Sequence, residues 1–275
     1  MTMAIRFKTM PQLDPIKLLP QVVELTKQAG QKIMSLYSCD FSIVQKKDDS
    51  PVTEADMAAH AMIDDGLEEI AEQYPVLSEE STAIHFEDRV RWERYWLVDP
   101  LDGTREFIDC TDEFTVNIAL IENHSPILGV IYAPALNVSY FAARNFGAYK
   151  QEGDGIARRI HVHKHRRNKA IIAGSRAQRS DSLNQFLKNL GDYEFKIMGS
   201  SLKSCMVAEG KADIYPRLGP TAEWDTAAAH CIVEEAGGHM TDINMQTLAY
   251  NTKDSLLNPH FFVFGDSSVI WADYL

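Results

Sequence analysis

Two aspartates and a backbone carbonyl lie close together where an apolar run of the chain ends. Asp99 and Asp102 are three residues apart, with the carbonyl of Leu101 between them. Pro100 has no N–H for a strand ladder and holds Asp99 extended, so we expect the buried strand that begins at Tyr95 to stop there. Carboxylate and carbonyl oxygens are the ligands that a hard divalent cation such as Mg2+ prefers. The segment therefore predicts a magnesium site at a strand exit.

The next two residues, Gly103 and Thr104, add the second half of a possible reaction site. Glycine permits close approach of the backbone, and we expect a short helix or turn to begin here. Free N–H groups at such a start favour an anion. A cation site followed directly by an anion site indicates metal-assisted phosphoryl transfer. Asp-Pro and Asp-Gly pairs are also ordinary turn formers, so each pair alone leaves that alternative open.

Other carboxylates follow short apolar runs or begin predicted helices. Glu79 comes after the pair Val76-Leu77, and Asp225 begins a predicted helix. Single acidic residues are more often solvated charges or helix-start residues. The joint occurrence of these carboxylates with Asp99 and Asp102 favours an all-oxygen metal shell.

A longer string around the two aspartates resembles a known family signature. The string Asp99-Pro100-Leu101-Asp102-Gly103-Thr104 is similar to the signature of the inositol monophosphatase superfamily of Mg2+-dependent, lithium-sensitive phosphatases. Its continuation to Phe107, with Phe114–Leu120 downstream, resembles the bacterial 3'(2'),5'-bisphosphate nucleotidase branch. The resemblance runs from Ser50 to Gly265. It implies a mixed α+β and α/β fold, the layered αβαβα sandwich of this family of sugar phosphatases.

The resemblance also implies the metal ligands and the number of ions. Two to three Mg2+ ions are expected. Glu79, Asp99 and the Leu101 carbonyl would bind the first, which would activate water. Asp99, Asp102 and Asp225 would bind the second, which would stabilise the leaving oxygen, and Glu79 would reach a third.

The catalytic residues implied by the resemblance are Asp56, Thr104 and Glu79. The segment Thr53-Glu54-Ala55-Asp56 is similar to the Thr-x-x-Asp segment of the family. By this match Asp56 and the Thr104 hydroxyl take a proton from the attacking water. Locally, Thr53 and Asp56 also fit a helix cap, which is compatible with the catalytic role.

Substrate contacts are expected in the second half of the chain. The segment Gly199-Ser200-Ser201-Leu202-Lys203 matches a Gly-Ser-Ser-x-Lys segment of the family at a helix start. Arg217 would stack on or flank a base, and Glu223 would contact substrate hydroxyls. Gln178 stands where this branch commonly has a histidine. The full predicted substrate-binding set is Glu79, Leu101, Asp102, Gly103, Thr104, Ser200, Lys203, Arg217, Glu223 and Asp225.

The implied activity is hydrolysis of the 3'-phosphate of 3'-phosphoadenosine 5'-phosphate to AMP and phosphate, in sulfate assimilation. The sulfated form of this nucleotide (PAPS) is a further possible substrate. An inositol or sugar monophosphatase with the same metal site is the enzymatic alternative. The non-enzymatic alternative is a protein that binds and senses nucleotide or lithium without catalysis. The expected partner is a small phosphorylated nucleotide.

Bulk properties limit the class of protein. The 275 residues are 45% hydrophobic and 24% charged, as in soluble globular enzymes. The net charge of −12 argues against nucleic acid polymers as partners. No run approaches the ~20 apolar residues of a membrane span, and the four cysteines are far apart, so we expect a cytoplasmic protein. Peripheral attachment to the cytoplasmic side of the inner membrane stays open, as does the choice between monomer and homodimer.

The elements that must position these residues change character along the chain. Apolar periodicity predicts a helix over Pro15–Tyr37 and another from Pro51 to Tyr74. The charged stretch 81–94 is expected to be a surface loop with a short helix. Strands and helices then alternate from Ala170 onward. We predict an α+β domain over 1–152 with most metal ligands and an α/β domain over 153–275 with Asp225. Antiparallel strands are expected over Phe114–Ile121, Ile127–Tyr132 and Val138–Ala143.

Overall fold

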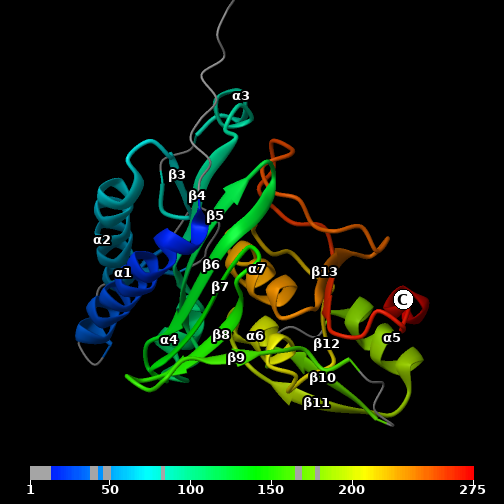
Figure 1. The fold of residues 1–275 in the computed structure, drawn as a ribbon. Helices are drawn as coiled ribbons and strands as arrows, with labels where there is room; N and C mark the ends of the chain where they lie inside the picture. Colours follow the sequence, from blue (N-terminus) through cyan, green and yellow to red (C-terminus); the bar gives the residue numbers. More distant parts are fainter. Residues whose placement is uncertain (1–13, 38–42, 46–50, 82–83, 165–168, 177–179) are drawn as a thin grey trace, which may run out of the picture.

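A seven-stranded β-sheet, a five-stranded β-sheet, a short two-stranded sheet and the helices around them form the molecule (Figure 1). The computed structural model describes residues 14–37, 43–45, 51–81, 84–164, 169–176 and 180–275, with 43–45 and 51–53 as backbone only. Gln178 and the side chain of Thr53, both named above, lie outside this description.

The larger sheet has seven strands in the order β3-β4-β5-β6-β7-β8-β9, all but the β3–β4 pair antiparallel. The smaller sheet has five strands in the order β11-β10-β12-β14-β13. The larger sheet contains β3 (Val76–Ser78), β4 (Arg94–Asp102), β5 (Thr115–Glu122), β6 (Ser125–Ala133), β7 (Val138–Ala143), β8 (Gly147–Glu152) and β9 (Arg158–Ile160). The smaller one contains β10 (Ala170–Gly174), β11 (Tyr193–Ile197), β12 (Ile214–Arg217), β13 (His239–Asp242) and β14 (Phe261–Phe264).

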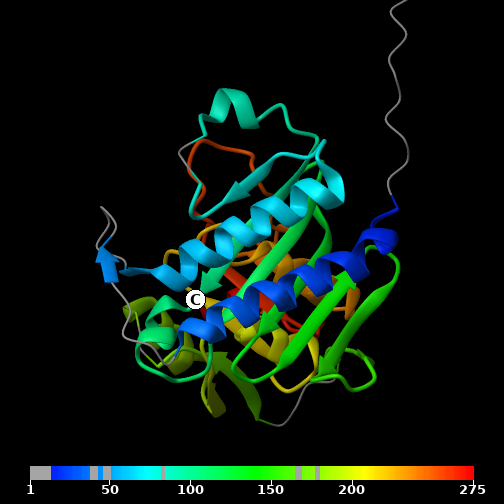
Figure 2. The same cartoon turned by 90° about the vertical axis from the view of Figure 1, so that its left-hand side faces the viewer.

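The helices complete five layers. Helices α1 and α2 cover the outer face of the larger sheet, α6 and α7 lie between the sheets, and α5 covers the far side of the smaller sheet (Figures 1 and 2). This αβαβα order confirms the expected sandwich. The helices are α1 (Pro15–Leu36), α2 (Glu54–Ala71), α3 (Phe86–Arg89), α4 (Thr104–Ile108), α5 (Asp181–Leu190), α6 (Leu202–Ala208) and α7 (Ala227–Glu235), with a 3-10 turn η1 (Trp271–Tyr274).

Strand β5 shows why the central strands are apolar over most of their length. Successive side chains of a strand point to opposite faces of the sheet. Ile118 and Leu120 are buried against α1 and α2, whereas Ala119 and Ile121 are buried in the core that contains α7. Both faces of the sheet are covered, so neither face of β5 carries the polar residues of a solvated strand.

Helix α7 touches the larger sheet at a glycine. A Cβ added at Gly129 of β6 would lie 2.3 Å from the carbonyl oxygen of Ala228. No side chain fits in that space, so the backbone of α7 rests directly on the backbone of β6. Ala227 and Ala229 flank this point, and both are buried. The contact fixes the start of α7, directly after Asp225, relative to the larger sheet.

Several boundaries differ from the sequence prediction. The second helix begins at Glu54 instead of Pro51, because residues 51–53 form strand β2 (Pro51–Thr53), which pairs with β1 (Ile43–Gln45). Strand β4 continues to Asp102 instead of stopping at Asp99. Its ladder with β5 shifts register between these two residues, around Pro100, which has no N–H to donate. Strand β13 and η1 were not predicted.

The chain passes from the larger sheet to the smaller one between Ile160 and Ala170. Gly153 and Gly155 lie in the turn between β8 and β9, both strands of the larger sheet. The division into two domains after residue 152 stays a prediction. Within the described residues, none of the helices combines the length and the apolar content needed to span a membrane.

Candidate active site

Three carboxylates from distant parts of the sequence meet beside the larger sheet. Oxygen atoms of Glu79, Asp99 and Asp225 all lie within 4.8 Å of one another. Strands β3 and β4 are parallel neighbours, and the Glu79 N–H donates to the carbonyl of Val98 at 3.1 Å, which places Glu79 next to Asp99. Asp225 lies two residues before the start of α7 (Ala227–Glu235). The three residues form a candidate metal site.

Burial makes this cluster electrostatically unfavourable without a positive charge. Asp99 is 1% exposed, and its burial raises its pKa well above the usual range. Surrounding negative charges raise this pKa further, those of Glu79, Asp102, Asp225 and Asp56. Burial also raises the pKa of Asp225 from 3.8 to about 8, with Asp102 and Glu79 as further causes. Buried carboxylates at such separations require protons or a cation between them, so this all-oxygen donor set fits Mg2+.

Asp102 adjoins the cluster and is held by donors from two other elements. Its Oδ2 accepts the Ser200 hydroxyl at 2.5 Å, the Ser201 N–H at 2.7 Å and the Asn117 amide at 3.5 Å. All three bonds go to one oxygen atom. The orientation of the Asp102 carboxylate is therefore set by β5 and by the turn before α6.

Thr115 and Asn117 are residues that the sequence analysis missed. The Thr115 hydroxyl lies 2.5 Å from the hydroxyl oxygen of Ser200 and 2.9 Å from that of Ser201, and it donates to the Asn117 side-chain oxygen at 3.0 Å. Thr115 and Asn117 are two residues apart, so they share one face of β5. Two polar side chains on the same face of an otherwise apolar strand are the sequence pattern that could have indicated these residues.

Replacing Thr115 by Val is expected to destabilise the protein by about 1–3 kcal/mol. The change keeps the shape but removes the hydroxyl that Ser200, Ser201 and Asn117 share in a buried place. Urea unfolding monitored by circular dichroism measures the loss. Thr115→Ser retains the hydroxyl and is the matched control. A Thr115→Val protein as stable as wild type would contradict this account of the cluster.

The predicted catalytic residues lie around the same carboxylates. Asp56 is 1% exposed in the first turn of α2 and is close enough for its charge to raise the pKa of Asp99. The Thr104 hydroxyl donates to the Leu101 carbonyl at 3.3 Å. Gly103 precedes α4 with a φ of 90°, a left-handed conformation that favours glycine. The proton relay between Asp56 and Thr104 stays a prediction.

A cavity of about 130 Å³ opens beside Asp102 and Asp225. The cavity wall includes Ser200 and Lys203, two residues predicted to bind substrate. Lys203 is 7% exposed, donates to the Ser200 carbonyl at 2.6 Å and lies 5.5 Å from the centre of the Tyr215 ring. A buried ammonium group next to the carboxylate cluster suits the binding of an anionic group such as phosphate.

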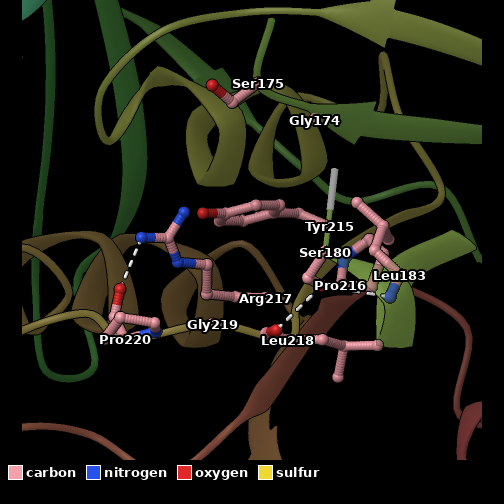
Figure 3. Close-up of a pocket in the computed structure, with 10 residues that line it drawn as sticks. All are labelled: Gly174, Ser175, Ser180, Leu183, Tyr215, Pro216, Arg217, Leu218, Gly219 and Pro220. Atoms are coloured by element: carbon pink, nitrogen blue, oxygen red, sulfur yellow. Dashed lines mark hydrogen bonds between the residues drawn. The ribbon is translucent and has the colours of Figure 1, made fainter. Parts of the chain in front are cut away.

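A second cavity, of about 290 Å³, shares part of its wall with the first. Ser175, Tyr215 and Arg217 line both cavities. Figure 3 shows Tyr215 and Arg217 along the wall of the second one, where the Arg217 guanidinium donates to the Pro220 carbonyl at 2.6 Å. A second guanidinium bond goes to the Thr221 hydroxyl. The predicted position of Arg217 beside a base is consistent with this placement.

Glu223 does not line either cavity. It is fully buried, and its carboxylate accepts the N–H of Asn251 at 2.8 Å and lies 3.7 Å from the Lys253 ammonium. The sequence predicts that Glu223 contacts substrate hydroxyls. Such a contact would require the Glu223 carboxylate to leave the Asn251 N–H and the Lys253 ammonium. The adjacent Trp224 packs against the core that contains α7.

The fold and the acidic site agree with the family to which the chain belongs. The model of the inositol monophosphatase family matches residues 14–263, so the chain is a member of that family. Among curated relatives, the 3'(2'),5'-bisphosphate nucleotidase CysQ of Salmonella typhimurium is 49% identical over 248 residues, which covers 90% of this chain and 99% of the relative. The protein of the same name from Escherichia coli (strain K12) is 48% identical, with the same coverage.

Solved structures agree with this assignment. CysQ from Bacteroides thetaiotaomicron, described as a bacterial member of the inositol monophosphatase family, has a TM-score of 0.80 and 40% identity to this chain. The similarity covers 90% of this chain and 96% of that one. An inositol monophosphatase of Thermotoga maritima shares the fold at a TM-score of 0.77 and 24% identity over 95% of this chain and 96% of its own.

Proposed function

We propose that this protein is a 3'(2'),5'-bisphosphate nucleotidase that removes the 3'-phosphate of 3'-phosphoadenosine 5'-phosphate and leaves AMP. The observation that carries the proposal is the carboxylate cluster of Glu79, Asp99 and Asp225, in which Asp99 is buried, beside a cavity with Lys203 in its wall. The sequence similarity to nucleotidases named CysQ supports the choice of substrate. A role in sulfate assimilation is part of the same proposal.

The carboxylates and one carbonyl would hold the metal. We assign Mg2+ to ligands from Glu79, Asp99, Asp102, Asp225 and the Leu101 carbonyl. Mg2+ would supply positive charge for the phosphate oxygens and a lowered pKa for the attacking water. Asp56 and Thr104 would accept the proton that this water loses.

The residues beyond the cluster would bind the rest of the nucleotide. Lys203 and Ser200 would hold a phosphate or ribose in the first cavity, and the N–H groups of Gly103 and Thr104 would bind a phosphate oxygen. Arg217 and Tyr215 would flank the base in the second cavity. A substrate with two phosphates and a base would extend through both cavities, whereas inositol monophosphate is short enough for the first alone.

A phosphate-release assay across substrates tests the proposed function. We expect 3'-phosphoadenosine 5'-phosphate to give a kcat/KM about 10- to 100-fold above that of inositol monophosphate, because only the nucleotide has a base for the second cavity. Activity should require Mg2+, and AMP should be inert. A preference for inositol or sugar monophosphates would support the alternative enzyme. Phosphate release at background with every substrate would support a binding protein.

A further inference from the structure

Arg89 is a buried arginine in the segment that the sequence predicts as a charged surface loop. It ends α3 and is only 1% exposed. Its guanidinium donates to the side-chain oxygen of Asn251 at 2.5 Å, to the Lys253 carbonyl at 3.2 Å and to the Asp254 carbonyl. The Asn251 amide in turn donates to the Arg89 carbonyl at 2.6 Å. Four contacts therefore join α3 to the loop 250–258, and the two lie together in Figures 1 and 2.

Asn251 connects Arg89 to Glu223. The N–H of Asn251 donates to Glu223 at 2.8 Å, and both residues are fully buried. Burial raises the pKa of Glu223, and the Asn251 N–H together with the charges of Lys253 and Arg89 opposes this rise. The carboxylate of Glu223 is thus held where the buried positive charge of Arg89 acts on it.

The same loop holds the turn that carries Asp225. The N–H of Glu223 donates to the Leu256 carbonyl at 2.8 Å, and the Asn258 amide donates to the Ala222 carbonyl at 2.8 Å. The N–H of Ala222 donates to Oδ2 of Asp225 at 3.1 Å. The loop therefore fixes the backbone group to which the Asp225 carboxylate is anchored.

We propose that Arg89 is a positioning residue: through Asn251 and Glu223 it holds the turn that presents the Asp225 carboxylate to the candidate metal site. This inference rests on the proposed role of Asp225 as a metal ligand. By this inference Glu223 helps to hold the turn that carries Asp225 and does not contact the substrate. Replacing a partner that orients a metal ligand typically lowers metal affinity or activity by about 10- to 100-fold.

The test compares Arg89→Gln with Arg94→Gln in the full-length protein. Arg94 is half-buried, and its guanidinium pairs with Glu122 at 2.7 Å, in β4 and β5 of the larger sheet. Mn2+ binding to the substrate-free protein is measured by calorimetry, together with melting temperature, kcat and KM. We expect Arg89→Gln to raise the Mn2+ dissociation constant about 10- to 100-fold and to lower kcat, with KM at saturating Mg2+ unchanged. Arg94→Gln should lower the melting temperature alone.

Equal losses of melting temperature in both variants, with unchanged Mn2+ affinity, would overturn the proposal and leave Arg89 a purely structural residue. A second pair of variants, Glu223→Gln and Glu223→Ala, tests the same proposal if Arg89→Gln does not fold.

Glu223→Gln keeps an oxygen that can accept the Asn251 N–H, so we expect it to retain Mn2+ affinity. Glu223→Ala has no such oxygen, so we expect it to lose Mn2+ affinity. A change confined to KM for the nucleotide would contradict the proposal in favour of a substrate contact. The Mn2+ titration contains no nucleotide, so an absence of nucleotidase activity would reject the proposed function without deciding this test.

Discussion

Asp99→Asn is expected to lower turnover on the order of 10³-fold while the fold survives. A cation at this site contributes several kcal/mol of transition-state stabilisation, and each 1.36 kcal/mol is about tenfold in rate. Asp99 lies in the centre of the cluster, with Glu79 and Asp225 within 4.8 Å. A neutral amide there also removes one of several repelling charges. The metal-free variant should therefore melt at a higher temperature than metal-free wild type.

Phosphate release under saturating Mg2+ and thermal melting in a chelator provide the two measurements. Asp64→Asn is the matched control, because it makes the same chemical change at an exposed position of α2. We expect it to leave both properties unchanged. An Asp99→Asn protein that is unfolded, or that is folded and fully active, would be inconsistent with a metal-binding role for this residue.

The stability of the metal-free protein should fall as pH rises from about 4 to about 8. The pKa of Asp225 is raised from 3.8 to about 8 in the folded protein, so the folded state binds more protons than the unfolded state in this range. Below the unfolded-state pKa of 3.8, Asp225 is protonated in both states and does not change the stability with pH. Above it, stability falls progressively until the pH passes the folded-state pKa of about 8. Asp99, whose pKa is also raised, adds to the slope.

Mg2+ should oppose this loss, because it binds the deprotonated carboxylates. We expect the increase in melting temperature caused by Mg2+ to be small near pH 5 and to become large near pH 8. Asp225→Asn removes the titrating group and should reduce the slope measured in a chelator. A metal-free protein whose stability is constant over this pH range would show that the carboxylates are not mutually repelling.

Much of the fold could be predicted from residue patterns because the core depends on local periodicity. The three antiparallel strands β5, β6 and β7 lie close to their expected bounds, since both faces are buried and the chain reads as apolar runs between turns. Helix α1 shows its stripe of buried residues from Leu19 to Ile33. Strand β13 was missed, because His239 and Thr241 have no apolar pattern of their own and the strand depends on pairing with β14.

The metal site was more predictable than its surroundings. The chemistry of Asp99 and Asp102 is visible in residue type and spacing. That Glu79 and Asp225 share their site was implied by the family resemblance, and the structure brings both to Asp99 as expected. Arg89 could not be found in this way, because an arginine in a charged stretch is ordinarily solvated and only tertiary partners make its burial possible. Glu223 was expected to contact substrate because the segment Glu223-Trp224-Asp225 resembles a family segment, whereas its position depends on a loop about thirty residues away.

The direct contact between the backbones of α7 and β6 at Gly129 has a consequence for how selectivity can change in this family. A motion that moved α7 away from the larger sheet would separate Gly129 from Ala228, and with it Asp225 from Glu79 and Asp99. The grouping of these carboxylates therefore depends on this contact. We therefore expect substitutions in the loop around Arg217 and Pro220 to reshape the second cavity while the carboxylates keep their places.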